Sequence, residues 1–477
     1  MGLTDLGNQR FNDFGIENWE LEMTFEFSRR NVLKTLSCGF GYMALAGLTT
    51  KAAEDSQNPL APRKPHYPAT AKRVIFLCMR GGPSHVDTFD YKPQLTKDSG
   101  KQSPGQKSRK LMGSPWSFQQ HGESGLPISE LFPHLGKHAD DLCLINGMAG
   151  EVPNHPQAYL KLHTGSFRFV RPSVGSWALY GLGTENQDLP GFITLNPETR
   201  VGGAQNYGSS FLPAYYQGTA IGQINQSLAN ARFGNIKNPR FSESLQREQL
   251  NLLQEMNQEL LNKKQVSPEL EGVIESYELA FRMQNTVPTL MDVSSESKET
   301  LDMYGVGVKE TDNFGRQCLL ARRFAESGVR FIELCHGNWD QHGNLKGKLE
   351  ANCRATDQPI AALLSDLKQR GMLKDTLVVW GGEFGRTPHV KKKDGRDHNA
   401  TGFSTWMAGG GVQGGQRVGA TDEYGITAIE NKMNFHDLHA TMLHTLGLDH
   451  TKLTYRYAGR DFRLTDVYGR VVKEILS

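Results

Sequence analysis

Three polar side chains follow an apolar segment near the middle of the chain, and their types suit metal binding. Residues 329–335 form a short apolar run that predicts a buried strand, and His336, Asp340 and His342 lie in the glycine-containing loop after it. Asp340 and His342 are two residues apart, so an extended backbone would point both side chains to the same side. A carboxylate and an imidazole on one side suit Zn²⁺ or Mn²⁺. The alternative is a polar loop that binds no ion.

Other predicted strand ends carry polar residues of the same kinds. These residues are Ser84, His85, Asp87 and Asp90 after the first predicted strand, Glu383 and Arg386 after a later one, and Asp397 and His398 in a last segment. The loops that follow parallel strands converge at one edge of a sheet, so these sets can meet. Their order along the chain therefore predicts a metal site at that edge.

Strands and helices alternate along the chain from residue 71 onward. This alternation predicts a doubly wound α/β fold, in which a mostly parallel sheet has helices on both faces. The predicted strands are residues 71–79, 142–145, 329–335, 376–381 and 403–408, and the predicted helices are residues 154–165, 173–182, 314–327, 349–370 and 435–446. The polar, basic residues 91–120 predict a long surface loop. Residues 242–302 carry apolar residues at helical spacing and predict a helical insert of two or three amphipathic helices.

The bulk composition excludes some classes of partner. The net charge of the 477-residue chain is +2, which does not call for a nucleic-acid or anionic-membrane partner. No segment after the N-terminal region is apolar for long enough to span a bilayer. Six cysteines occur without a CxxC pair, and Cys38 lies in the N-terminal region. The remaining five predict buried free thiols, with one disulfide as the alternative.

The N-terminal segment resembles an export signal. Ser28-Arg-Arg-Asn-Val-Leu-Lys34 resembles the twin-arginine motif, and a moderately apolar run follows it. We therefore expect residues 1–54 to be the signal peptide with its n-region, residues 55–70 an extended leader, and residues 71–477 the folded domain. The protein would then be exported to the periplasm or the exterior and keep no stable membrane span. The alternative is a chance pair of arginines before an apolar helix.

Four segments together resemble an uncharacterised, largely exported bacterial family within the alkaline phosphatase/sulfatase superfamily. They are Gly81-Gly-Pro-Ser-His-Val-Asp-Thr-Phe-Asp90, His336-Gly-Asn-Trp-Asp-Gln-His342, Gly382-Glu-Phe-Gly-Arg-Thr-Pro388 and Gly395-Arg-Asp-His-Asn399. The resemblance covers about residues 70 to 465. It implies a doubly wound sheet in which carboxylates and histidines hold one or two divalent ions that activate a nucleophile.

The resemblance assigns metal ligands one residue at a time. Asp340 and His342 match an Asp and His pair of the superfamily, and His398 matches its last histidine. Glu383 keeps one carboxylate where the superfamily has Asp-His, and Asp87 is the nearest substitute for the Asp after the first strand. With that histidine lost, we expect one divalent ion, with zinc or manganese favoured and calcium a further candidate. Asp397 would orient its neighbours from outside the ligand set.

The resemblance leaves the nucleophile open. Leu160-Lys-Leu-His-Thr-Gly165 resembles the end of the sulfatase motif, but His155 stands where the modified cysteine would be, which argues against a formylglycine-dependent enzyme. Ser84 or Thr88 is a candidate alkoxide nucleophile. Alternatively, a metal-bound hydroxide attacks and His155 acts as a base or an extra ligand. For Ser84 and His155 the other reading is a polar residue at a helix start or turn.

These residues lead to one expected function and one rival. Arg386 lies within its motif and can clamp an oxyanion, whereas residues 391–393, all lysine, fit a solvated loop better. We expect an exported metal-dependent hydrolase of phosphate or sulfate esters, acting on a small anionic ester or a sulfated or phosphorylated glycan. The rival is a secreted structural or carbohydrate-binding protein that keeps the fold without turnover. A serine hydrolase ranks third, because Gly82-Pro-Ser-His-Val86 lacks the second glycine of a nucleophile elbow.

Overall fold

The computed structural model describes residues 60–231, 240–264 and 268–477. The export signal predicted for residues 1–54 lies outside these ranges, as do the first residues of the predicted leader. Within these ranges, no helix has both the length and the apolar character needed to cross a membrane.

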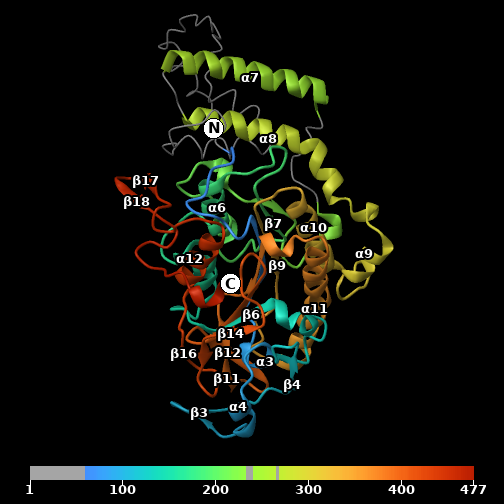
Figure 1. The fold of residues 1–477 in the computed structure, drawn as a ribbon, viewed down its shortest axis with the longest axis vertical. Coiled ribbons are helices and arrows are strands. Elements are labelled where there is room, and N and C mark those ends of the chain that lie inside the picture. The colour runs from blue at the N-terminus through green and yellow to red at the C-terminus, as the bar shows by residue number, and fades with distance from the viewer. Residues whose placement is uncertain (1–59, 232–239, 265–267) are drawn as a thin grey trace, which may run out of the picture.

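A mostly parallel sheet forms the centre of the described chain (Figure 1). Its eight strands lie in the order β14-β6-β13-β10-β1-β9-β7-β8. They are β1 (Arg73–Met79), β6 (Leu142–Met148), β7 (Phe192–Leu195), β8 (Thr219–Ile221), β9 (Phe331–His336), β10 (Thr376–Gly381), β13 (Phe403–Ala408) and β14 (Gln416–Val418). Within this sheet, β13 alone runs antiparallel to its neighbours β10 and β6. The predicted α/β class is confirmed.

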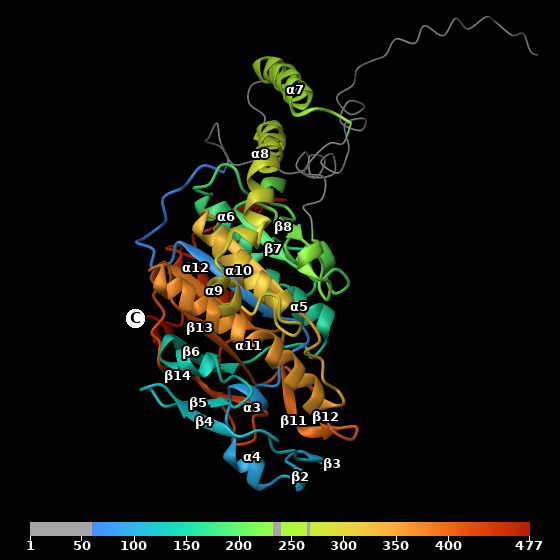
Figure 2. The ribbon, with the colours of Figure 1, turned by 90° about the vertical axis from the view of Figure 1, so that its right-hand side faces the viewer.

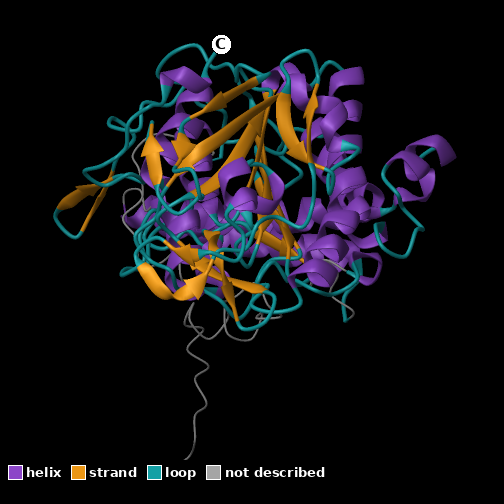
Figure 3. Cartoon of the chain, turned by 90° about the horizontal axis from the view of Figure 1, so that it is seen from below, coloured by secondary structure: helices purple, strands orange, loops and turns teal. Residues whose placement is uncertain are grey.

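Helices cover both faces of the sheet (Figures 2 and 3). On one face, α10 (Asp312–Glu326) and α11 (Leu345–Gln369) share a core with Ile75 and Leu77 of β1. On the other face, α5 (His155–Thr164), α6 (Val174–Leu182) and α12 (Phe435–Thr445) pack with Val74 and Phe76. Successive side chains of a strand point to opposite faces, and burial on both faces explains why β1 is apolar almost throughout.

Smaller elements surround this core. Five two-stranded sheets pair β2 (Gln102–Ser103) with β3 (Gln106–Lys110), β4 (Phe118–His121) with β5 (Leu126–Ser129), β11 (Gly385–Lys391) with β12 (Gly395–Asn399), β15 (Ala420–Thr421) with β16 (Ala428–Glu430), and β17 (Tyr455–Tyr457) with β18 (Arg460–Phe462). Two short helices, α3 (His85–Thr88) and α4 (Pro93–Lys97), follow β1.

One sequence expectation differs from the structure, and two features of the central sheet were not predicted. Residues 91–120 are not one long loop, because they contain α4, the hairpin of β2 and β3, and β4. The strands of that hairpin are polar, so they lack the apolar alternation by which a strand is recognised. The strands β7 and β8 were not predicted, since each has only three or four residues. The direction of β13 was not predicted either.

The insert predicted at residues 242–302 contains helices, as expected. They are α7 (Glu243–Lys264), α8 (Pro268–Met291) and α9 (Lys298–Met303). Arg247 of α7 donates to Glu278 of α8 over 2.9 Å, which joins the two long helices. Both lie at the opposite end of the molecule from β11 and β12 (Figure 1).

Candidate metal centre

Several chain segments meet at the carboxyl ends of β1, β6, β9 and β10. The loop after β1 passes so close to the loop after β9 that a Cβ on Gly81 would lie 2.7 Å from the backbone nitrogen of Asp340. Gly81 also has a φ of +123°, which L-residues rarely adopt. A glycine is therefore required at this point for the two loops to come together.

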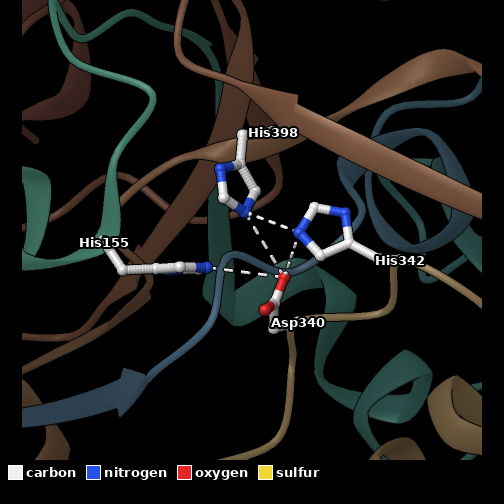
Figure 4. Close-up of side chains that lie close together, drawn as sticks. All are labelled: His155, Asp340, His342 and His398. Atoms are coloured by element: carbon white, nitrogen blue, oxygen red, sulfur yellow. Dashed lines mark hydrogen bonds and ion pairs between the residues drawn. The ribbon is translucent and has the colours of Figure 1, made fainter. Parts of the chain in front are cut away.

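Four side chains converge there from three segments (Figure 4). His155 is the first residue of α5, Asp340 and His342 follow β9, and His398 lies on β12. One ligand atom of each lies within 4.8 Å of the others. The Oδ1 atom of Asp340 lies 3.0 Å from His342 Nε2 and 3.4 Å from the Nε2 atoms of His155 and His398. Three imidazole nitrogens thus surround one carboxylate oxygen.

Hydrogen bonds on the far side of two rings select the tautomer that a metal ligand needs. His155 Nδ1 lies 2.6 Å from Glu383 Oε1, and His398 Nδ1 lies 2.9 Å from the carbonyl oxygen of Pro153. Both partners are acceptors, so each Nδ1 carries a proton, and each Nε2 faces the group with a lone pair that is available to an ion when the ring is neutral. Acceptors placed behind the ring are a usual feature of metal-binding histidines.

The third imidazole is held less firmly. His342 Nε2 lies 2.9 Å from His398 Nε2. With the proton of His398 on Nδ1, its Nε2 accepts a hydrogen bond from the Nε2–H of His342 when no ion is bound. To bind an ion, both Nε2 atoms would have to present a lone pair. His342 Nδ1 has no hydrogen-bond partner in the described ranges, although Asp397 Oδ1 lies 3.7 Å away. This is the side from which Asp397 was expected to orient the site.

Glu383 lies behind the group and holds two segments in place. Its carboxylate accepts the Nδ1–H of His155 and, over 3.0 Å, the backbone N–H of Gly81. Burial would raise the pKa of Glu383, but the hydrogen bond and charge of His155 outweigh burial, so its pKa is lowered. The predicted ligand Glu383 therefore contacts a ligand rather than belonging to the four-residue group.

Arg386 is completely buried and joins the loops after β1 and β9. Its guanidinium donates to the carbonyl oxygens of Gly81, Gly82 and Trp339 and, over 2.7 Å, to Asp340 Oδ1. These donors are turned toward the chain itself. Arg386 therefore sets the position of Asp340 in this structure, whereas the sequence predicted it as a clamp for an anionic substrate.

The surrounding charges keep Asp340 ionised. Burial would raise its pKa, but the neighbouring imidazoles of His155 and His398 and the charge of Arg386 lower it well below the usual range. Burial would lower the pKa of His155, and its contacts with Asp340 and Glu383 instead raise it. Asp340 is 36% exposed and His155 is 15% exposed, so the group is reached by solvent from the side of Asp340.

Asp87 and Ser84, two other predicted site residues, lie outside the four-residue group. Asp87 is buried and forms a two-pronged ion pair with Arg396, with contacts of 2.7 and 2.9 Å. The Ser84 hydroxyl is also buried, and it donates to Asp87 Oδ2 over 2.5 Å. His336 lies apart as well, where its Nδ1 accepts the indole N–H of Trp339 over 3.1 Å. Each of these polar groups has a partner within the protein.

The four-residue group fits a divalent ion. Three imidazole nitrogens with one carboxylate oxygen are a donor set typical of Zn²⁺ and also compatible with Mn²⁺. His155 Nε2 is buried and makes no hydrogen bond in the described part of the chain, as expected for an atom that awaits an ion. Asp340, His342, His398 and His155 would hold the ion, with Glu383 and Arg386 behind them.

Two features of the site have no clear signal in the sequence. One is the carbonyl oxygen of Pro153, which any residue could supply. The other is the buried pair of Asp87 and Arg396, whose members lie 309 residues apart. The sequence did carry a signal for His155, because this residue stands at the start of a predicted helix that follows a predicted strand.

Comparison with known proteins gives a family and a set of remote structural neighbours. A family described as a protein of unknown function (DUF1501) matches residues 71–476. No match was found among curated proteins.

Three of the structural neighbours illustrate how remote this likeness is. The lipoteichoic acid synthase LtaP from Listeria monocytogenes has a TM-score of 0.36 and 9% identity, over 89% of this chain and 79% of that one. The PsFucS1 sulfatase from Pseudoalteromonas sp. has a TM-score of 0.35 and 12% identity, over 81% and 68%. Alkaline phosphatase from the Antarctic bacterium TAB5 has a TM-score of 0.34 and 12% identity, over 79% and 98%.

Proposed function

The chain belongs to DUF1501, a family of proteins of unknown function, so its activity has to be inferred from its own site. We propose that the protein is a metal-dependent hydrolase of phosphate or sulfate esters. The observation that carries the proposal is the convergence of His155, His342 and His398 on Asp340. The class of ester comes from the resemblance of four sequence segments to the alkaline phosphatase/sulfatase superfamily.

The protein's own residues have separable tasks in this proposal. A bound divalent ion would supply Lewis acidity and lower the pKa of water, which then serves as the nucleophile. The three histidines and Asp340 hold the ion, and Glu383 keeps the Nδ1 proton on His155. Water rather than Ser84 is the proposed nucleophile, because the Ser84 hydroxyl is buried and already donates to Asp87.

Metal analysis and an ester assay test the proposal together. Protein purified without chelator or affinity nickel is loaded with Zn²⁺ or Mn²⁺, and hydrolysis of aryl phosphate and aryl sulfate is measured. We expect turnover that is lost in Asp340→Asn and His398→Ala, and kept in His134→Ala, a matched change at an exposed histidine. The proposal is contradicted if Asp340→Asn still turns over the ester, or if the metal-loaded wild-type protein shows no turnover.

A non-catalytic glycan-binding protein is the second candidate, and one observation favours it. Arg386 and Ser84, the predicted anion clamp and nucleophile, are both fully buried and engaged by the chain. Metal-loaded protein that binds a sulfated or phosphorylated glycan without hydrolysing it would select this candidate. Loss of binding in His398→Ala would place the glycan at the metal centre.

Export by the twin-arginine pathway belongs to the proposal as well. It is supported by Ser28-Arg-Arg-Asn-Val-Leu-Lys34, which lies outside the described residues. A change of Arg29 and Arg30 to lysine should retain the protein in the cytoplasmic fraction. Unchanged export of that variant would contradict this part of the proposal.

A further inference from the structure

A second group of metal-binding side chains lies inside the core, away from the first. Cys78 of β1 and Cys335 of β9 stand directly opposite each other in the parallel register of the two strands. Glu333 lies two residues before Cys335, so its side chain is on the same face. His163 approaches from α5, which packs on that face. All four residues are at most 2% exposed.

Three of these four side chains have ligand atoms close enough to share one ion, and His163 lies next to two of the three. The ligand atoms of Cys78, Glu333 and Cys335 lie within 4.8 Å of one another. Cys335 Sγ lies 3.2 Å from Glu333 Oε1, while His163 Nε2 lies 2.9 Å from Glu333 Oε1 and 3.8 Å from Cys78 Sγ. Tetrahedral zinc with such ligands places neighbouring donor atoms roughly 3.3 to 3.8 Å apart. An ion would draw these donor atoms closer together and bring His163 Nε2, which lies outside the group of three, to the fourth position.

The surroundings orient the ring of His163 and contact both thiols. His163 Nδ1 donates to the carbonyl oxygen of Tyr159 over 2.7 Å, which leaves its Nε2 facing the group. The Tyr159 hydroxyl lies 3.4 Å from Cys78 Sγ and 3.7 Å from Cys335 Sγ. The surroundings therefore fix the ring of His163 and place one hydroxyl near both sulfur atoms.

A buried, unpartnered hydroxyl lies beside this group. Thr194 of β7 is opposite Glu333 in the register of β7 and β9, so both side chains lie on the same face. Its Oγ1 has no hydrogen-bond partner among the described residues and is fully buried. Buried polar groups without partners are costly, and they commonly mark an ion or water that completes the site.

We propose that Cys78, Cys335, Glu333 and His163 form a buried zinc site with a structural role. Two thiolates, an imidazole and a carboxylate make a closed four-ligand set, as in zinc sites that stabilise a fold. The site joins β1, β9 and α5. His155 begins the same helix, eight residues before His163. About 12 Å of helix therefore separates this site from the four-residue group of His155, Asp340, His342 and His398, the first centre. The proposal does not depend on the ester hydrolase activity.

Cobalt substitution tests this site in the full chain. His398→Ala removes a ligand of the first centre, so the remaining metal reports on the second. In that background we expect about one zinc per chain and, after loading with Co²⁺, a near-ultraviolet charge-transfer band from thiolate to cobalt. Adding Cys78→Ser and Cys335→Ser should remove both. Cys143→Ser with Cys353→Ser, which changes two buried thiols elsewhere, should keep both.

The spectrum of the His398→Ala protein decides the question even if the double cysteine variant does not fold. A missing band after cobalt loading overturns the proposal. So does a band that survives the loss of Cys78 and Cys335, or a disulfide between these two cysteines found by mass spectrometry of non-reduced protein. His163→Gln, which removes one ligand, should keep the fold and lower the zinc affinity at least tenfold.

Discussion

In the proposed metal centre, Glu383 should influence the affinity for the ion, because it orients the ring of His155. It accepts the Nδ1–H of His155 over 2.6 Å from a fully buried position. Glu383→Gln keeps an acceptor oxygen but removes the charge that stabilises this hydrogen bond. We expect the affinity for zinc to fall about 10- to 100-fold, measured by competition with a chelating dye. Glu130→Gln, at an exposed carboxylate that pairs with Ser117, is the matched control, and equal affinities in the two variants would contradict the prediction.

Asp87 can be assigned to stability or to metal binding by one pair of variants. Because its carboxylate pairs with the buried guanidinium of Arg396, Asp87→Asn should leave that charge without a partner and lower the free energy of unfolding by about 3–5 kcal/mol. The double variant Asp87→Leu/Arg396→Met should recover much of this loss. Zinc content per folded chain should stay unchanged in both, by elemental analysis. A loss of zinc in Asp87→Asn would restore Asp87 as a ligand.

At the residue scale, the sequence predicts which loops approach one another better than which side chains of those loops join the four-residue group. Asp340, His342 and His398 were expected together and are found together. Asp87 also follows a predicted strand, but the turn after β1 directs its carboxylate to Arg396. A strand end places several polar residues in one loop, and the turn geometry that selects among them depends on partners hundreds of residues away.

At the element scale, Gly81 tests whether two loops must touch for the site to form. Gly81→Ala would bring a Cβ within 2.8 Å of backbone atoms of Trp339 and Asp340, at a φ of +123°. Gly307→Ala is the matched control, because its φ is +91° and nothing lies within 4 Å of the added atom. We expect Gly81→Ala to lose about 1–3 kcal/mol more stability than Gly307→Ala and to bind zinc more weakly. Equal effects in chemical unfolding and metal titration would show that the contact is unimportant.

The elements that the sequence reveals best are those with continuous apolar runs. The strand residues of β1, β9 and β10 are buried on both faces, so their composition alone identifies them. The strand β7 is only four residues long, and its place beside β9 depends on pairing that no local pattern records. The antiparallel direction of β13 is likewise a property of its neighbours β10 and β6.

At the scale of the whole molecule, buried neutral histidines should make the fold sensitive to acid. Burial lowers the pKa of His336 to about 4 and that of His439 to about 3, from 6.5. Below pH 6.5 these histidines bind protons in the unfolded chain but remain neutral in the folded protein. The free energy of unfolding should therefore be highest above pH 6.5 and decrease as the pH falls toward 4. Each group should contribute a slope of about 1.4 kcal/mol per pH unit.

Chemical unfolding at several pH values checks this expectation. His439→Gln should reduce the dependence of the free energy of unfolding on pH between about 5 and 6.5 by the contribution of one group. His134→Gln changes an exposed histidine and should leave it as it is. An unchanged slope in His439→Gln would contradict the prediction, because it would mean that this histidine binds its proton equally well in the folded and the unfolded protein.

The contacts of Arg386 have a consequence for the speed of ion capture. Because its guanidinium holds Asp340 Oδ1 at 2.7 Å and three backbone carbonyls of the neighbouring loops, the first centre keeps its shape through links that involve no ion. Such a preorganised site spends little free energy on rearrangement when it binds. Zinc added to metal-free protein should therefore enter in one fast phase whose rate rises in proportion to the zinc concentration. In Arg386→Met, a slow phase that does not depend on the zinc concentration should follow, because the two loops must first rearrange into the binding geometry.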